Sequence, residues 1–299
     1  MGKLRYLVSL ITKDNDYQME QAASAKAAAA ELGVDVEIVY AGNDAITQST
    51  QLLKVIQAAE LRPEAIIVEP LGATPFPKVA AAAATAGIGW AVVNREAEYT
   101  SELRRTSRSP VFSISVDQTE VGRIQAKQIA TLLPEGGSVL LIQGPSVSSV
   151  SRERYQGLLE ALPTNVQIVS LRGKWTEESA HQSVASWMGL MRVSQFRTDL
   201  ICGQNDAMAM GAKKAVHELA GEINREVVAT LPVIGCDGVP RTGQAWVRSG
   251  QMAATVIVPP SAGKAIHLMT RELQNQVPPA LHTFTTPEPF PSMDVLKPR

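Results

Sequence analysis

Short apolar runs alternate along the chain with longer stretches that have helical spacing. The apolar runs lie at residues 5–11, 36–40, 65–69, 90–94, 111–116, 138–143, 166–171, 199–203, 231–236 and 253–258. Some of them are almost continuously apolar, such as AIIV at 65–68 and VLLI at 139–142, which is typical of strands covered on both faces. Repeated strand–helix–strand order predicts an α/β fold with doubly wound parallel sheets.

The stretches between the apolar runs predict the helices. Alanine-rich or amphipathic spacing occurs at 18–32, 46–60, 74–86, 119–132, 176–193, 206–219 and 261–275. The stretch 95–110 is polar and without periodicity, so we expect a surface loop there. The proline-rich tail at 276–299 cannot form a long helix and is expected to run extended.

Two polar side chains follow two of the predicted strands. GQND at 203–206 follows the apolar run LIC, and GCDG at 235–238 follows PVI. In open parallel sheets, ligands bind outside the carboxyl ends of the strands. Asn205 and Asp237 therefore come to that edge as hydrogen-bond acceptors, and because no nucleophile accompanies them the pattern favours hydroxyl recognition over bond breaking.

Composition limits the classes of partner. The 299 residues are long enough for two lobes, each with its own core. The 28 Lys+Arg balance 29 Asp+Glu, so bulk charge indicates neither a nucleic-acid nor a membrane partner. No run of apolar residues is long enough to span a bilayer. The expected location is periplasmic or extracytoplasmic if a leader has been removed, and cytoplasmic otherwise.

Signatures of catalysis and of metal binding are missing. GVPRTGQ at 238–244 has the glycine spacing of a phosphate-binding loop, but Gln244 stands where that motif requires Lys. The four histidines are scattered and have no second ligand type at metal spacing. Cys202 and Cys236 follow apolar runs and are expected to be buried free thiols. We therefore expect neither an enzyme nor a cofactor.

Five motifs together give the chain a family resemblance. VVNRE (92–96), SVDQTEVGR (115–123), SRERYQG (151–157), GQNDAMAMGA (203–212) and VIGCDGVP (233–240) resemble the type I periplasmic sugar-binding proteins of the ribose- and galactose-binding group. That fold is shared with the effector domains of lac-repressor-like regulators. The resemblance implies two α/β lobes joined by three hinge crossings that close on a ligand, here residues 1–117 with 259–284 and 118–258 with 285–299.

The resemblance also implies ligand-binding residues. NDYQ at 15–18 matches the loop after the first strand, so Asn15, Tyr17 and Gln18 are expected to contact the ligand. The other matched positions are Glu69, Asn94, Arg95, Asp117, Arg152, Trp175, Asn205 and Asp237, with Arg154 in place of Arg152 if the helix register differs by a turn. Asn94 stands where the family has an acid.

The residue types suit a sugar. Carboxylate and amide oxygens can accept from hydroxyls, the planar guanidinium of Arg95 can donate to two oxygens, and the rings of Tyr17 and Trp175 can cover an apolar sugar face. Structural alternatives stay open: Asn205 as a helix cap, Asp237 as a turn residue, and Arg95 as a surface residue. Trp175 could equally pack on its own lobe.

Departures from the family pattern bear on the ligand. Glu69 stands where ribose binders have an amide, Val258 where they have a hinge glutamine, and Gln18 where they have a second stacking aromatic. A polyol, another sugar, a modified sugar or a cationic ligand therefore stays open. The resemblance implies a monomeric solute-binding component of an ABC importer, with a permease as its partner. The alternative is a ligand-sensing module of a signalling or transcriptional system without its own DNA-binding domain.

Overall fold

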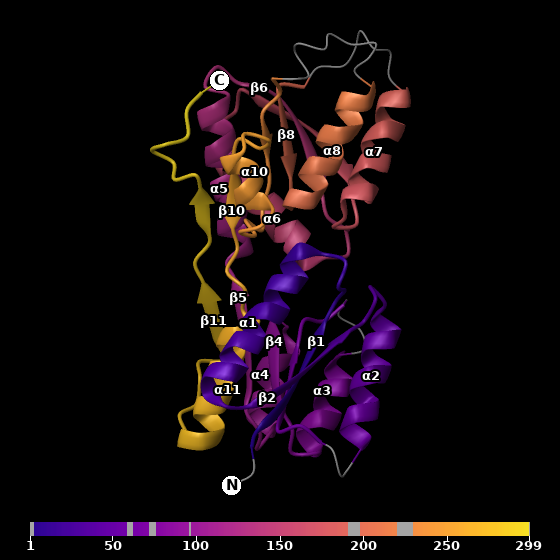
Figure 1. Ribbon diagram of the computed structural model, residues 1–299, viewed down its shortest axis with the longest axis vertical. Helices are drawn as coiled ribbons and strands as arrows, with labels where there is room; N and C mark the ends of the chain where they lie inside the picture. The colour runs from indigo at the N-terminus through magenta and orange to yellow at the C-terminus, as the bar shows by residue number, and fades with distance from the viewer. Residues whose placement is uncertain are drawn as a thin grey trace. The chain divides into compact units, whose positions relative to one another are not determined.

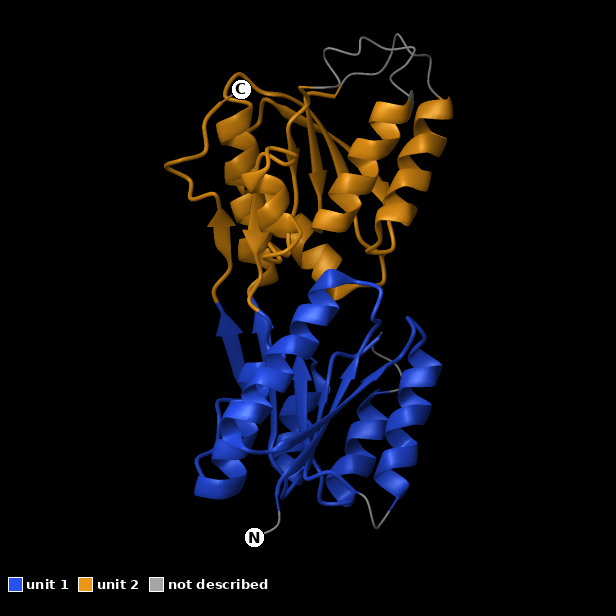
Figure 2. Ribbon diagram, in the orientation of Figure 1, with its two compact units in different colours: residues 1–116, 260–285 blue, residues 117–259, 286–299 orange. Residues whose placement is uncertain are grey.

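The chain divides into two compact units. The computed structural model describes residues 3–58, 62–71, 76–95, 97–190, 198–219 and 230–298. Residues 1–116 with 260–285 form unit 1, and residues 117–259 with 286–299 form unit 2 (Figure 2). The chain passes from one unit to the other after residues 116, 259 and 285.

Unit 1 is built on a six-stranded parallel sheet (Figure 1). Its order is β11 (His282–Thr285), β5 (Val111–Val116), β4 (Gly89–Val93), β3 (Ala65–Val68), β1 (Arg5–Leu10) and β2 (Asp35–Tyr40). Successive side chains of β1 point to opposite faces of the sheet: Tyr6 and Val8 join one core cluster and Leu7 joins the other. Parallel strands buried on both faces are what the continuous apolar runs predicted.

Helices cover both faces of the unit 1 sheet. One core cluster joins it to α1 (Asp16–Leu32) and α11 (Ala262–Asn275). The other joins it to α2 (Ala45–Gln57), α3 (Phe76–Thr85) and α4 (Tyr99–Thr106). The prediction of a loop over 95–110 was wrong, because α4 occupies much of this stretch. Its few buried residues, among them Leu103, are too sparse to produce an apolar period.

Unit 2 repeats this arrangement. Its parallel sheet has the order β7 (Val166–Arg172), β6 (Gly137–Gln143), β8 (Leu200–Gly203) and β9 (Val233–Ile234). One core cluster includes α5 (Gln118–Leu132) and α6 (Ser149–Ala161), and the other includes α7 (Glu177–Leu190) and α8 (Asp206–Leu219). The short helix α10 (Gly243–Arg248) follows β9. Some ends of predicted helices, at 59–60, 74–75 and 191–193, lie outside the described residues.

The proline-rich tail is extended, as predicted, and contributes a strand to each unit. β11 pairs in parallel with β5, whereas β12 (Glu288–Phe290) pairs antiparallel with β10 (Thr255–Ile257). Both strands are short. The doubly wound α/β architecture therefore agrees with the sequence, and the two pairings of the tail are what the sequence did not indicate.

Two glycines allow α5 and α6 to pack closely. A Cβ on Gly122 would lie 2.0 Å from the backbone oxygen of Arg154, and a Cβ on Gly157 would lie 1.8 Å from that of Thr119. Both contacts are far shorter than two atoms can tolerate, so neither position can carry a side chain without moving a helix. The close approach sets the position of the turn of α6 that carries Arg154.

We expect Gly157→Ala to lower the free energy of unfolding by about 2 kcal/mol or more, because the added methyl group must push α6 away from α5. Gly189→Ala is the matched control: Gly189 lies in α7, and no atom lies within 4 Å of the place that its methyl group would take. That change should leave stability unchanged or raise it by up to about 1 kcal/mol. Urea unfolding of both variants measures the difference, and equal values would contradict the packing argument.

Candidate ligand-binding site

Polar side chains gather at the carboxyl ends of the strands of unit 1. Glu69 follows β3, Asn94 and Arg95 follow β4, and Tyr17 and Gln18 begin the helix that follows β1. We call these five residues the unit 1 group. They come from separate parts of the chain and meet because parallel strands end at the same edge of their sheet.

The Glu69 carboxylate is the centre of the unit 1 group. It is almost fully buried and accepts hydrogen bonds from Gln18 Nε2 and from Asn94 Nδ2, both at 2.8 Å. The Arg95 guanidinium lies 4.0 Å from the same carboxylate. A buried charge is stable only when it is paired and hydrogen-bonded, and these contacts meet both conditions.

Tyr17 is buried, and its hydroxyl is hydrogen-bonded to two side chains. It is only 5% exposed, and its hydroxyl donates to Asn94 Oδ1 at 3.3 Å while accepting from Gln21 Nε2 at 3.2 Å. Gln21 was missed by the sequence reasoning. Its position one helical turn after Tyr17 was the available signal, because residues four apart share a helix face.

Two predicted ligand residues serve as helix caps. Asn15 Oδ1 accepts from the backbone N–H of Gln18 at 3.2 Å, and Asp117 Oδ1 accepts from that of Glu120 at 2.9 Å. Asp117 is exposed, at the boundary between the units. Capping satisfies an unpaired N–H group at the start of a helix, so both side chains have a structural role that needs no ligand.

Unit 2 brings Arg154, and not Arg152, to the other predicted ligand residues. Arg152 is exposed and donates to the Ser146 backbone oxygen at 3.4 Å. Arg154 is only 3% exposed and lies 3.7 Å from the Asp237 carboxylate. The structure thus places the arginine of the alternative register, Arg154, beside Asp237, and a ligand contact by Arg154 is a proposal. Residues two apart on a helix face nearly opposite sides, so only one of the pair can lie on the buried face.

Arg154 is held on several sides. Its Nε donates to Gln118 Oε1 at 2.8 Å, and its Nη1 donates to the backbone oxygen of Gln204. Its guanidinium also lies 5.9 Å from the centre of the Trp175 ring, within the range of a cation–π contact. Contacts with the protein itself therefore orient the fork of Arg154. We call Arg154, Trp175, Asn205 and Asp237 the unit 2 group.

Trp175 packs against its own unit. A Cβ on Gly144 would lie 2.2 Å from ring carbon Cζ2, so the ring lies directly on the Gly144 backbone. The indole also contacts the core cluster around α7 and α8. These contacts fit the alternative that Trp175 packs within its own lobe. The residue is also partly exposed, so a contact between its ring and a ligand stays a proposal.

Asn205 caps a helix, as the structural alternative stated. Its Oδ1 accepts from the backbone N–H of Met208 at 2.9 Å at the start of α8. Its Nδ2 donates to the backbone oxygen of Trp175 at 3.1 Å. Asn205 thereby joins the start of α8 to the loop that carries Trp175, and it orders the unit 2 group.

Backbone strain coincides with the predicted ligand residues. Among the described residues other than glycine, φ is positive at Asn43, Asn94, Trp175, Asp237 and Gln276. Asn43 lies in a turn and Gln276 caps α11, whereas the other three, with φ of 64°, 66° and 104°, belong to the two groups. This region is costly for a tryptophan or an aspartate and persists at functional sites.

Asp206 is hydrogen-bonded to the residue that follows Asp237. Its Oδ1 accepts from the Thr255 hydroxyl at 2.6 Å, and its Oδ2 accepts from the Gly238 backbone N–H at 2.8 Å. Burial raises the pKa of the Asp206 carboxyl well above its usual value, and the negative charge of Asp237 raises it further. The sequence reasoning missed Asp206, although it adjoins Asn205 in GQND.

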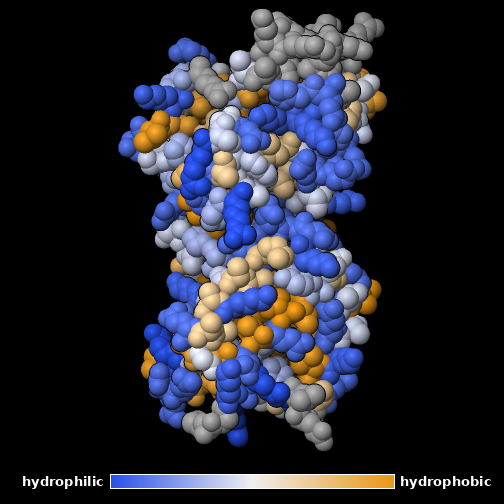
Figure 3. Space-filling model, in the orientation of Figure 1, coloured by the Kyte–Doolittle hydropathy of each residue, from blue (hydrophilic) through white to orange (hydrophobic). Residues whose placement is uncertain are grey.

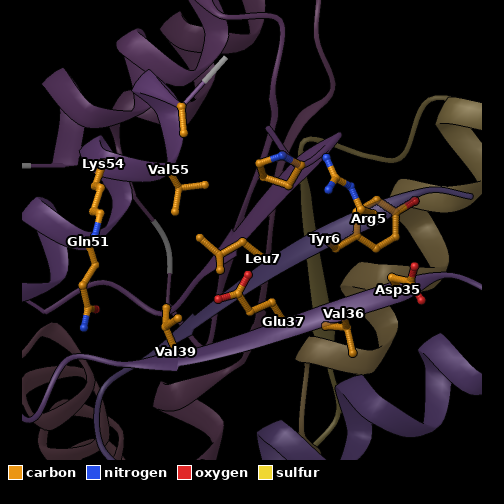
Figure 4. A pocket seen from close by; sticks show the side chains of 12 residues that line it. Arg5, Tyr6, Leu7, Asp35, Val36, Glu37, Val39, Gln51, Lys54 and Val55 are labelled. Atoms are coloured by element: carbon orange, nitrogen blue, oxygen red, sulfur yellow. The ribbon is translucent and has the colours of Figure 1, made fainter. Parts of the chain in front are cut away.

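A separate groove lies on unit 1. Its volume is about 490 Å³, and β1, β2 and α2 supply most of its lining. Figure 4 shows Leu7, Val39 and Glu37 together in it. Figure 3 shows an apolar area where Figure 1 draws β1 and β2. None of the predicted ligand residues lines this groove, so it is distinct from the unit 1 group.

The chemistry of the two groups is that of recognition. Each pairs a carboxylate with an arginine, and the unit 1 group adds two amides while the unit 2 group adds an amide and an indole. Together they supply donors, acceptors and an apolar surface, which are the requirements for binding hydroxyl groups. In the part of the chain that the structure describes, no cluster of His, Cys, Asp and Glu could hold a metal ion.

We expect Asp206→Asn to keep the fold and to change the pH dependence of stability. The folded state holds the Asp206 proton more tightly than the unfolded state does, since its folded pKa is raised. Its contribution to the free energy of unfolding is therefore fully present below about pH 3.9 and is lost as pH rises through the folded pKa. Asparagine does not titrate and can still accept from Gly238 and donate to Thr255.

The stability of the variant relative to the native chain should therefore grow as pH rises from about 4 to 7. Urea unfolding at a series of pH values measures this difference, in which the other titrating groups largely cancel. A difference that is constant with pH would show that Asp206 is charged in both states. Asp206→Ala, which strands the Gly238 N–H, should be destabilised at every pH.

Comparison with known proteins agrees with these observations. Residues 6–276 match the periplasmic binding protein domain. A xylitol-binding protein of Mycolicibacterium smegmatis is 28% identical over 78% of this chain and 63% of its own length. A putative rhizopine-binding protein of Rhizobium meliloti is 27% identical over 67% of this chain and 62% of its own length. The chain thus spans less than two thirds of each of these relatives.

A solved structure shows the same fold. A periplasmic solute-binding protein of an ABC transporter from Actinobacillus succinogenes, with bound D-allose, has a TM-score of 0.82 at 22% identity and covers 96% of this chain and 97% of its own. No described helix of the present chain has the length and apolar character to cross a membrane. The match over most of the chain confirms the resemblance to type I periplasmic sugar-binding proteins, and the chain belongs to the periplasmic binding protein domain family.

Proposed function

We propose that this protein binds an uncharged polyhydroxylated ligand, a polyol or a sugar, and delivers it to an ABC importer without chemical change. The unit 1 and unit 2 groups are the proposed binding residues. The observation that carries the proposal is the pairing, in each unit, of a largely buried carboxylate with an arginine at the carboxyl end of a strand. Neither group contains a nucleophile with an adjacent base, so binding without turnover follows.

The charge of the groups favours an uncharged ligand. Glu69 lies beside Arg95, and Asp237 lies beside Arg154, so each carboxylate already has a cation nearby. A cationic ligand would bring a second positive charge to each pair, and an anionic ligand would bring a second negative charge. A hydroxyl group carries no net charge and both donates and accepts, so it can bind beside such a pair without unbalancing the charge of the pair.

The relatives support the same class. The names of several of the relatives and solved structures refer to xylitol, D-ribose, D-allose or myo-inositol, all of them polyhydroxylated. An extracytoplasmic location, a monomeric state and a permease partner belong to this proposal as well. The alternative of a sensing module is kept because a fructose-binding periplasmic domain of a hybrid two-component system has the same fold, with a TM-score of 0.78. Reconstituted transport with the permease would separate the two roles.

We expect a member of a panel of xylitol, D-ribose, D-allose and myo-inositol to raise the melting temperature. A ligand that binds only the folded state adds about 2.7 kcal/mol of stability at a hundredfold excess over Kd. Thermal shift measurements with the panel, followed by recovery of the unchanged ligand, test both binding and the absence of turnover. A shift with nucleotides but with no polyol or sugar would refute the ligand class, and a converted ligand would refute pure binding.

We expect Arg154→Lys to weaken ligand binding by tenfold or more, about 1.4 kcal/mol, while Arg152→Lys leaves it unchanged. A lysine cannot reproduce the planar fork by which Arg154 contacts Gln118, Gln204 and Asp237 together. Isothermal titration calorimetry on folded samples of both variants measures the difference. The reverse result, with Arg152 sensitive and Arg154 tolerant, would restore the assignment that the sequence favoured.

A further inference from the structure

Glu69 is the common end point of two chains of hydrogen bonds. The residue is only 1% exposed, and each of its two carboxylate oxygens accepts from a different amide, Gln18 and Asn94. An ionised carboxylate has acceptors and no donor, so each neighbouring amide must turn its NH2 group toward it. The direction of each chain can therefore be traced from its other end.

The first chain starts at a backbone amide. The Ile11 N–H donates to Gln18 Oε1 at 2.9 Å, and Gln18 Nε2 donates to Glu69 Oε2. A backbone N–H can only donate, so the oxygen of Gln18 must face Ile11 and its nitrogen must face Glu69. The Gln18 amide is thus locked from both ends.

The second chain starts in the segment just after the second crossing between the units. The backbone N–H groups of Ser261 and Ala262 donate to Gln21 Oε1 at 2.9 and 2.8 Å, which turns Gln21 Nε2 toward the Tyr17 hydroxyl. Tyr17 then donates to Asn94 Oδ1, and Asn94 Nδ2 donates to Glu69. Every bond in this chain points from the backbone toward the carboxylate.

We propose that Glu69 is a positioning residue that sets the orientation of the Asn94 amide and, through it, the ligand selectivity of the unit 1 group. This inference rests on the proposed function, because it takes Asn94 as a ligand-binding residue. Glu69 can hold both amides only because both of its oxygens accept. Asn94 itself has the strained φ of 64°, so its backbone already restricts where the amide can lie.

Replacement of Glu69 by glutamine should disrupt the hydrogen bond between position 69 and Asn94. A glutamine at position 69 has one acceptor oxygen. The Gln18 NH2 group must donate to that oxygen, because the hydrogen bond from the Ile11 N–H prevents the Gln18 amide from turning over. The NH2 group at position 69 then faces the NH2 group of Asn94. Two donors cannot bond, so Asn94 must turn over and present the opposite atoms, or lose the contact. Adding Asn94→Asp restores the hydrogen bonds, because a carboxylate at position 94 accepts from the glutamine NH2 group at position 69 and from the Tyr17 hydroxyl.

A double-mutant cycle without ligand tests the orientation. Asn94→Asp alone sets two carboxylates against each other and should lower the melting temperature, and Glu69→Gln alone should lower it as well. The double variant Glu69→Gln/Asn94→Asp should melt above both single variants. Glu102→Gln, a change of the same kind at an exposed position on α4, is the control and should melt like the native chain. Losses that simply add would overturn the proposal.

Selectivity is tested by calorimetry with xylitol, D-ribose, D-allose and myo-inositol. Glu69→Gln should change the ratio of Kd between the two tightest of these ligands by about tenfold, the equivalent of one exchanged hydrogen bond. In an Asn94→Ala background, the same change at Glu69 should leave that ratio unaltered, because the residue through which Glu69 acts is gone.

The outcomes separate this inference from the proposed function. If Glu69→Gln leaves the ratio unchanged, or changes it equally when position 94 is alanine, Glu69 acts by direct contact or through Arg95 and the inference is wrong. If none of the four ligands binds the native chain, the proposed function fails, while the ligand-free cycle still decides whether Glu69 orients Asn94.

Discussion

The structure of both groups depends on the burial of a carboxylate at the end of a strand. A carboxylate removed from water is stable only if donors replace the water around both of its oxygens. Glu69 has two amides and a guanidinium for this purpose, and the largely buried Asp237 lies beside Arg154. The surrounding features follow from this requirement, because each donor must itself be held in place.

Different devices hold the donors in the two units. In unit 1 the donors are side-chain amides whose orientation is set by backbone N–H groups at Ile11, Ser261 and Ala262. In unit 2 the Arg154 guanidinium supplies the positive charge beside Asp237, and the glycines at the α5–α6 contact let its helix approach closely enough for its Nε to donate to Gln118. Asp206, whose raised pKa follows from burial, holds the Gly238 N–H next to Asp237. Both solutions hold polar atoms at the strand ends through contacts with the protein itself, and a site held in this way has a lower ordering cost of binding.

The sequence predicted the α/β architecture and most of the strands, because continuous apolar runs depend on local pattern alone. It did not predict α4, whose buried residues are too few to produce a period. It also left Arg152 and Arg154 as alternatives. A signal for Arg154 was present: Val150 and Leu158 are buried four residues before and after it on α6, so all three lie on one helix face.

Other site residues could not be resolved from sequence, for a physical reason. An asparagine at a strand end can cap a helix or bind a ligand. The sequence around Asn205 and Asn15 is compatible with either role. Only the geometry shows that Asn205 Oδ1 accepts from Met208 and that its Nδ2 holds the Trp175 loop. Hydrogen-bond direction decides such cases, and it depends on neighbours distant in sequence, such as Gln21 and Ser261, which are 240 residues apart.

The second crossing of the chain is bonded to both groups, each within its own unit. Before the crossing, Thr255 donates to Asp206, and the Val258 N–H donates to the backbone oxygen of Asp237. After it, Ser261 and Ala262 donate to Gln21, which donates to Tyr17. Pro259 and Pro260 lie between these anchors and restrict the backbone torsions of the crossing. The residues on either side of this crossing are therefore hydrogen-bonded to Asp206 and Asp237 in unit 2 and to Gln21 in unit 1.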